Sequence, residues 1–140
     1  MPKYIAVTYM LAILLLGTNA MCEDSSGKEM ALTSANIWLA HIDKEEYAES
    51  WRNAATLLKD AITVPQLEQS VSTARKPFGK LISRKVTKQE YHTSLPGAPD
   101  GNYYVIQFSS KFENKAKAIE TITTVKDENG AWHVSGYFIK

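Results

Sequence analysis

Three histidines are the residues of this chain best suited to metal binding or proton transfer, and their spacing favours neither role. His41, His92 and His133 lie far apart in the sequence, whereas two metal ligands on one helix face lie a few residues apart. His92 and His133 could meet across a sheet, but surface or half-buried positions are more common for such residues. We therefore expect no metal site and no cofactor.

Nucleophilic catalysis lacks its usual sequence signals as well. No Gly-x-Ser-x-Gly elbow surrounds a serine, the only cysteine is Cys22 near the N-terminus, and no glycine-rich loop opens a helix to hold phosphates. Asp43 and Glu46 could act as acid and base, but their spacing is also that of a capping box. We expect that the chain is not an enzyme. The alternative is a small enzyme that uses a Tyr, His or acidic residue in a cavity.

Two other groups of residues are candidates for binding. The first is a loop rich in proline and glycine, Ser94, Leu95, Pro96, Gly97, Ala98, Pro99, Asp100 and Gly101, which presents a ligand surface or simply fixes a turn. The second is a set of aromatic residues, Trp38, Trp51, Tyr91, Tyr104, Phe108 and Trp132, which either form the core or line a pocket between helices and sheet. Polar groups such as Gln107 or Glu120 would favour a pocket if they converged on that space.

The first twenty residues have the pattern of a signal peptide. Residues 5–17 are almost entirely apolar, about a dozen residues where a bilayer span needs about 20, and small residues precede Ala20. We expect cleavage after Ala20, no permanent membrane span, and an exported protein that is periplasmic or secreted. A lipid anchor at Cys22 is a minor alternative, because Asn19 and Met21 fit a lipoprotein site poorly.

Length and charge set further bounds. The 140 residues suffice for one domain, and the chain has 16 basic and 15 acidic residues. Lys3 is the only charged residue among residues 1–20, so their removal leaves 15 basic and 15 acidic residues. A chain without excess positive charge is an unlikely partner for nucleic acid. A basic cluster remains, which we interpret as a solvated strand face rather than an anion site: Lys76, Lys80, Arg84, Lys85 and Lys88.

Helical periodicity dominates the first half of the chain after a polar segment, residues 21–29, that predicts a disordered leader. One apolar stripe predicts a helix from about residue 30 to Asp43. Asp43 and Glu46 predict the capping box of a second helix that continues to about Leu58. Thr63 and Gln66 predict a third helix, which ends near residue 76 because Pro77 and Gly79 follow.

After Gly79 the apolar period changes from about four residues to two. This alternation predicts strands over residues 81–95, 102–112, 117–126 and 132–139. Asp127-Glu128-Asn129-Gly130 is a strong hairpin signal between the last two strands. In the last strand, Trp132, Val134, Gly136 and Phe138 are expected to share one face. The sequence therefore predicts an α+β fold, residues 30–140, with three N-terminal helices packed on a four-stranded antiparallel meander sheet.

Several segments resemble a known family: Trp38-Leu39-Ala40-His41-Ile42-Asp43 with Tyr47 and Ser50-Trp51, the loop 94–101, residues 104–108 and residues 132–140. They are similar to a family of exported bacterial proteins catalogued as domain of unknown function 4019, over essentially the whole chain after Lys28. The resemblance implies export and a compact α+β domain, and it carries over no catalytic residues. More distantly, the pattern resembles the cone-shaped domains of the nuclear transport factor two-like, or cystatin-like, class.

We expect a non-catalytic exported module that binds a protein partner or a small ligand in the cell envelope. Besides the small enzyme with a cone-shaped cavity, a second alternative is a protein-interaction or inhibitory module that uses an exposed strand edge. An open cavity with a buried carboxylate would favour the enzyme, and a closed dry core would argue against both the enzyme and the ligand binder. A flat uncapped edge strand would favour the protein-interaction module.

Overall fold

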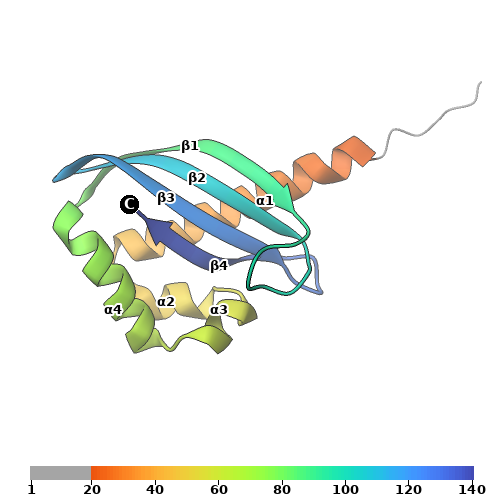
Figure 1. Ribbon diagram of the computed structural model, residues 1–140, viewed down its shortest axis with the longest axis horizontal. Helices are drawn as coiled ribbons and strands as arrows, with labels where there is room; N and C mark the ends of the chain where they lie inside the picture. Colours follow the sequence, from red (N-terminus) through yellow and green to blue (C-terminus); the bar gives the residue numbers. More distant parts are fainter. Residues whose placement is uncertain (1–19) are drawn as a thin grey trace, which may run out of the picture.

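The computed structural model describes the chain from Ala20 to Lys140, with side chains from Ser25 onward (Figure 1). The helices come first and the strands follow, as the change of period at Gly79 predicts. The helices are α1 (Ala20–Asp43), α2 (Tyr47–Arg52), α3 (Thr56–Ala61) and α4 (Val64–Arg75), and a 3₁₀ turn, η1 (Lys76–Phe78), follows α4. The strands are β1 (Leu81–His92), β2 (Tyr103–Phe112), β3 (Lys115–Lys126) and β4 (Trp132–Ile139).

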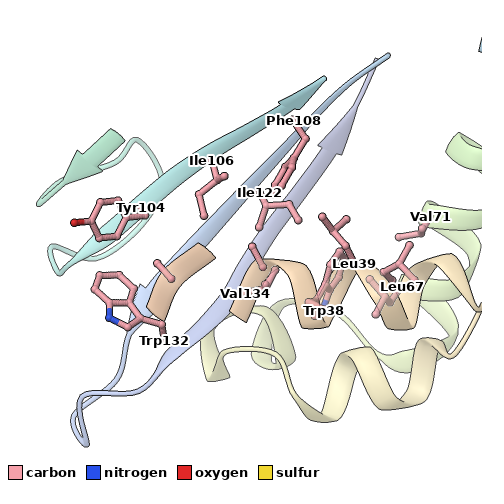
Figure 2. Close-up of a cluster of buried hydrophobic side chains, with 13 residues drawn as sticks. Trp38, Leu39, Leu67, Val71, Tyr104, Ile106, Phe108, Ile122, Trp132 and Val134 are labelled. Atoms are coloured by element: carbon pink, nitrogen blue, oxygen red, sulfur yellow. The ribbon is translucent and has the colours of Figure 1, made fainter. Parts of the chain in front are cut away.

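The four strands form one antiparallel sheet in the order β1-β2-β3-β4, a meander, and α1 runs along its inner face (Figure 1). Inward side chains of the sheet, such as Ile106, Ile122 and Val134, are fully buried against Trp38 and Leu39 of α1 (Figure 2). Leu67 and Val71 of α4 close the same core at its other end. The α+β fold with a meander sheet is therefore confirmed.

Local signals placed two boundaries correctly. At the start of α4 the Thr63 hydroxyl accepts from the Gln66 backbone N–H, and the Gln66 side chain accepts from the Thr63 N–H, which is the predicted capping box. At the β3–β4 turn, Asp127 Oδ1 accepts from two backbone N–H groups, those of Asn129 and Ala131, and Gly130 takes the positive φ of 83° that the turn requires.

The helices differ from expectation in two places. Residues 21–29, expected to be a disordered leader, belong to α1, where the Lys28 carbonyl accepts from Gln89 of β1 and Gly27 lies against Trp132. These tertiary contacts stabilise helix where composition alone indicates a loose segment. The second predicted helix is divided into α2 and α3, so that residues 20–140 contain four α-helices where three were expected.

Asp43 does not cap the second helix, and that prediction was wrong. Asp43 is the last residue of α1, and its carboxylate pairs with two arginines instead. Residue Glu46 precedes α2 without a side-chain capping bond, and its carboxylate lies 2.7 Å from His41 Nδ1. The Asp43 carboxylate therefore pairs with Arg75 and Arg84, which are distant in the sequence, and does not cap the nearby helix.

A β-bulge changes the faces of β4. Thr123 pairs with Gly136 and Thr124 pairs with Val134, so that Ser135 is the extra residue. Beyond this point Tyr137 points inward, with its ring 5.3 Å from that of Trp38, and Phe138 points outward and is 60% exposed. The expected alternation is therefore correct up to Val134 and wrong for Gly136 to Phe138.

Both edge strands of the sheet have features that hinder pairing with another strand. Edge strand β1 has register shifts between Leu81 and Ser83 and between Val86 and Lys88, and bulges of this kind oppose pairing with another strand. At the other edge, the Val134 carbonyl of β4 accepts from the Ala55 N–H at the start of α3. In residues 20–140, no helix combines the length and apolar character needed to cross a membrane.

Candidate functional site

Two regions of the described chain carry polar groups at unusual positions. One is a buried ion network at the C-terminal end of α1, made of Asp43, Arg75, Arg84, Ser110, Glu120 and Tyr137. The other is a groove between the N-terminal half of α1 and the β3–β4 turn, described below. They differ in composition, because the network consists of charged and hydroxyl groups that bind one another and the groove is lined mainly by apolar and neutral polar side chains.

Glu120 is the centre of the buried ion network and is completely inaccessible to solvent. Its Oε1 accepts from Arg84 Nε at 2.7 Å and from Ser110 Oγ at 2.6 Å. Its Oε2 accepts from Tyr137 Oη at 2.6 Å and from Arg84 Nη2 at 3.1 Å. With four donors on two oxygens the carboxylate has no free lone pair for a substrate.

The network continues from the sheet to the helices through Arg84. Its guanidinium holds Asp43 through two bonds, of 2.7 and 2.9 Å, while Arg75 Nη2 of α4 lies 2.8 Å from Asp43 Oδ1. The Arg75 guanidinium also lies 5.0 Å over the Phe112 ring. Two carboxylates and two guanidinium groups balance in charge, which is the condition under which buried charges are tolerated.

The pKa values of three network residues are shifted, in directions that keep Asp43 and Arg84 charged and Tyr137 neutral. For Asp43, burial acts to raise the pKa, but the bonds and charges of Arg84 and Arg75 outweigh it and hold the pKa below its usual value. Burial and the neighbouring Glu120 charge raise the pKa of Tyr137, so that this hydroxyl stays protonated and donates. Burial acts to lower the pKa of Arg84, yet its two carboxylate partners raise it. This arrangement joins α1, α4 and all four strands of the sheet.

A cavity of about 650 Å³ lies beside the network, with Asp43 and Arg75 in its wall. Arg75 Nη1 is buried there without a hydrogen-bond partner among the described residues. The other charged wall residues are mixed in sign: Lys44, Glu45, Lys76, Lys80 and Glu113. Since no sign dominates and Glu120 is not in the wall, this cavity does not combine with the buried carboxylate as an active site would.

The groove is a surface cavity of about 490 Å³. Its apolar wall contains Met30 and Ile37, which are 48% and 54% exposed, and its floor contains the nearly buried Trp38 and Trp132. The remaining wall residues are Ser26, Glu29, Thr33, Ser34, Asn53, Ala131 and His133. Trp38 Nε1 is buried without an acceptor among the described residues, an uncommon state for an indole N–H.

Regular structure positions the groove residues. Ser26, Glu29, Met30, Thr33, Ser34, Ile37 and Trp38 recur at helical spacing on one side of α1. Opposite them, Asp127 orders the turn before Ala131 and also lies 3.0 Å from His133 Nε2, while His133 Nδ1 lies 3.3 Å from the Asn53 carbonyl. The groove therefore has two walls that do not depend on a bound ligand for their shape.

The predicted binding loop does not contribute to either cavity. Residues Ser94, Leu95, Pro96, Gly97, Ala98, Pro99, Asp100 and Gly101 connect β1 to β2 and are absent from both walls. The loop is closed by bonds of its own, from the Gly101 N–H to the Thr93 carbonyl and from Tyr103 Oη to the Pro99 carbonyl. Its role as a binding loop stays a prediction without support from this geometry.

The histidines and the aromatic residues were the other candidates from the sequence. In the described part of the chain no three His, Cys, Asp or Glu side chains gather as a metal site would require. Of the aromatic set, Trp38, Tyr104, Phe108 and Trp132 are core residues, and Tyr91 is 46% exposed. Two of these, Trp38 and Trp132, also form the groove floor.

Sequence reasoning missed most of the buried ion network. Gln107 and Glu120 were named as polar residues that would favour a pocket if they converged on the space between helices and sheet. Glu120 lies on that side, whereas Gln107 lies on the opposite face of the sheet. Arg84 is not on a solvated strand face, as its lysine neighbours suggested, because its register with Ser110 turns it inward. A signal for Tyr137 was present in Gly136, since glycine inside a strand often marks a bulge.

Comparison with known proteins identifies a family but no characterised relative. The model of the family described as "Protein of unknown function (DUF4019)" matches residues 34–137, which include the whole ion network and the groove residues from Ser34 onward. No curated protein and no solved structure matches the chain. The expected family is thus confirmed, and the more distant relation to nuclear transport factor two-like domains is not confirmed.

Proposed function

The chain belongs to the DUF4019 family of proteins of unknown function, and we propose that it is an exported, non-catalytic module that binds a small amphipathic ligand. The binding site is the groove between α1 and the β3–β4 turn. The observation that carries this proposal is the composition of the groove: exposed apolar side chains and two tryptophans, surrounded by hydroxyl, amide and imidazole groups. Small-molecule sites have this combination and a volume of about 300–1,000 Å³.

The charge of the groove narrows the class of ligand. Among the described wall residues, Glu29 is the only one with a formal charge at neutral pH when histidine is counted as neutral, and none of them is a lysine or an arginine. A carboxylate or phosphate on the ligand would lose water without gaining a cationic partner. The preferred ligand therefore has an apolar or aromatic body and is neutral or cationic.

The non-catalytic part of the proposal is supported by the state of Glu120. It is the buried carboxylate that an enzyme would be expected to use, yet Arg84, Ser110 and Tyr137 occupy all of its acceptor positions. Export is supported by the sequence of residues 1–20, of which residues 1–19 lie outside the described residues. The N-terminus of the exported chain, measured by mass spectrometry, tests cleavage after Ala20 and decides between a free chain and one that carries lipid at Cys22.

The test of groove binding uses the neutral apolar dye N-phenyl-1-naphthylamine and two variants of one helix. Thr33→Trp fills the groove, since Thr33 lies in its wall, whereas Asn36→Trp adds the same side chain at an exposed position of α1 outside the wall. We expect saturable dye fluorescence with the natural chain and with Asn36→Trp. Thr33→Trp should weaken binding about tenfold or more, a loss of at least 1.4 kcal/mol.

Two results would overturn the proposal. Dye fluorescence that does not saturate with the natural chain would show that the groove is no site. Equal affinity of the two tryptophan variants would place the dye elsewhere. Thermal unfolding of both variants excludes misfolding as the cause, because both positions are exposed and tolerate a larger side chain.

A further inference from the structure

The outer face of the sheet, which α1 does not cover, carries a basic and apolar patch near the β2–β3 turn. Cross-strand pairs define its rows: Ser83 with Lys111, then Lys85 with Ser109 and Ile119, then Lys88 with Gln107, Thr121 and Phe138. Lys117 precedes the buried Ala118 and therefore points outward beside them. No acidic residue occupies the outer face in these rows.

The patch combines free positive charge with exposed apolar side chains. Lys85, Lys111 and Lys117 are exposed and have no ion-pair partner among the described residues, whereas Lys88 pairs with Glu90 at 3.1 Å. Between them Ile119 is 41% exposed and Phe138 is 60% exposed. A chain of formal net charge +1 that gathers three unpaired lysines around an exposed phenylalanine on one face has a surface suited to an anionic partner.

We infer that this lysine-framed patch (Lys85, Lys111, Lys117, Ile119 and Phe138) docks the domain onto an anionic lipid surface. Three features favour a bilayer over a folded acidic protein or a small ligand. Neither cavity of the molecule opens at these residues. The charges are lysines, which attract mobile headgroups as point charges, and not arginines, which hold carboxylates or phosphates in a fixed fork. Phe138 projects from the face, where an aromatic ring can enter the boundary between headgroups and acyl chains.

The orientation that follows keeps the groove accessible. Figure 1 shows α1 on one face of the sheet. The groove is formed by α1 and the turn before β4, whereas the patch residues lie on the other face of the sheet. Docking through the patch would therefore leave the groove open to solvent. The two sites are independent, and the failure of one leaves the other standing.

Vesicle flotation tests this inference on the chain purified after export. Binding is measured to vesicles of phosphatidylcholine alone and of phosphatidylcholine with phosphatidylglycerol, and the ratio of the two partition coefficients removes any contribution of an apolar N-terminal segment. We expect a ratio well above one that falls as salt is raised. Each lysine near an anionic surface contributes about fivefold, so the triple variant Lys85→Gln, Lys111→Gln, Lys117→Gln should lower the ratio at least tenfold.

Matched variants separate the patch from total charge. The control triple variant Lys44→Gln, Lys76→Gln, Lys126→Gln removes the same charge from exposed positions elsewhere and should leave the ratio within about threefold of the natural value, given screening beyond about 10 Å. Phe138→Ser should lower binding to anionic vesicles about tenfold with little effect on folding. A ratio near one for the natural chain, or an equal loss in both triple variants, would overturn the inference. Binding to polyglutamate in place of vesicles would also overturn it and assign the patch to an acidic protein.

Discussion

The ion network and the groove lie toward opposite ends of α1, and they differ in what their side chains contact: charged partners within the chain in the network, and open surface in the groove. At the C-terminal end, Glu120 accepts four hydrogen bonds and Asp43 holds two arginines, with Arg75 Nη1 the one orphaned atom. At the other end the groove contains exposed Met30 and Ile37 and, in its floor, the unpaired indole N–H of Trp38. The network therefore pairs both of its carboxylates within the chain and stabilises the fold, whereas the groove leaves apolar surface that a ligand can cover.

The largest expected effect comes from Glu120→Gln. The amide keeps the shape of the side chain but removes the negative charge that binds Arg84 and Tyr137. It also replaces one acceptor oxygen with an NH₂ group, which cannot accept the hydrogen bonds that this oxygen accepts in the natural chain. Breaking a buried ion pair in this way should lower the free energy of unfolding by about 3–5 kcal/mol. Urea unfolding at neutral pH measures the change.

The control is Glu128→Gln in the exposed β3–β4 turn, which should change stability by less than about 0.5 kcal/mol. If Glu120→Gln is too unstable to purify, Tyr137→Phe offers a milder version, with an expected loss of about 1–2 kcal/mol for one bond to a buried charge. A fully stable Glu120→Gln variant would contradict the view that the network is structural and would reopen the possibility of a functional carboxylate.

The next effect is a dependence of stability on acid pH through Asp43. Its pKa is lowered in the folded chain, so its contribution is complete above the unfolded pKa of about 4 and is lost as the pH falls through the folded pKa. Asp43→Asn should lose about 1–2 kcal/mol at pH 7, a value reduced because Asp43 is only half-buried. Its stability should then fall less steeply than that of the natural chain from pH 5 downward.

Asp60→Asn is the matched control, because Asp60 is exposed in α3 and forms no ion pair among the described residues. It should follow the natural chain within about 0.5 kcal/mol at each pH. Parallel curves for Asp43→Asn and the natural chain would show that Asp43 is not stabilised by Arg75 and Arg84 in solution.

The fold could be predicted because its signals are local and periodic. The change of apolar period at Gly79, the Thr63 capping box and the Asp127–Gly130 turn each act within a few residues of sequence. The errors have a common origin in contacts between distant residues. Asp43 has a local capping pattern, but in the folded chain it pairs with Arg75 and Arg84, which follow it by 32 and 41 positions in the sequence.

The candidate site could be predicted only in fragments for the same reason. Glu120 was named only as a polar group that would favour a pocket. Its partners Arg84, Ser110 and Tyr137 come from three other strands, and their positions depend on register. The groove combines one face of α1 with the β3–β4 turn, and part of α1 had the composition of a disordered segment. Its two tryptophans were in the aromatic set, but nothing in their spacing distinguished groove floor from core.

The smallest expected effect concerns the groove end of α1, where Gly27 lies inside the helix beside Trp132. A Cβ added at Gly27 would lie 3.5 Å from Trp132 Cζ2, an ordinary contact, and Ala is about 0.5–1 kcal/mol better than Gly inside a helix. Gly27→Ala should therefore raise the free energy of unfolding by that amount. The same change at Gly97 should cost about 1 kcal/mol, because its φ of 76° is strained for Ala although its Cβ would meet nothing within 4 Å. If Gly27→Ala is neutral while Gly97→Ala is destabilising, the first turns of α1 do not pack on Trp132 in solution, and the groove lacks the wall on which ligand binding depends.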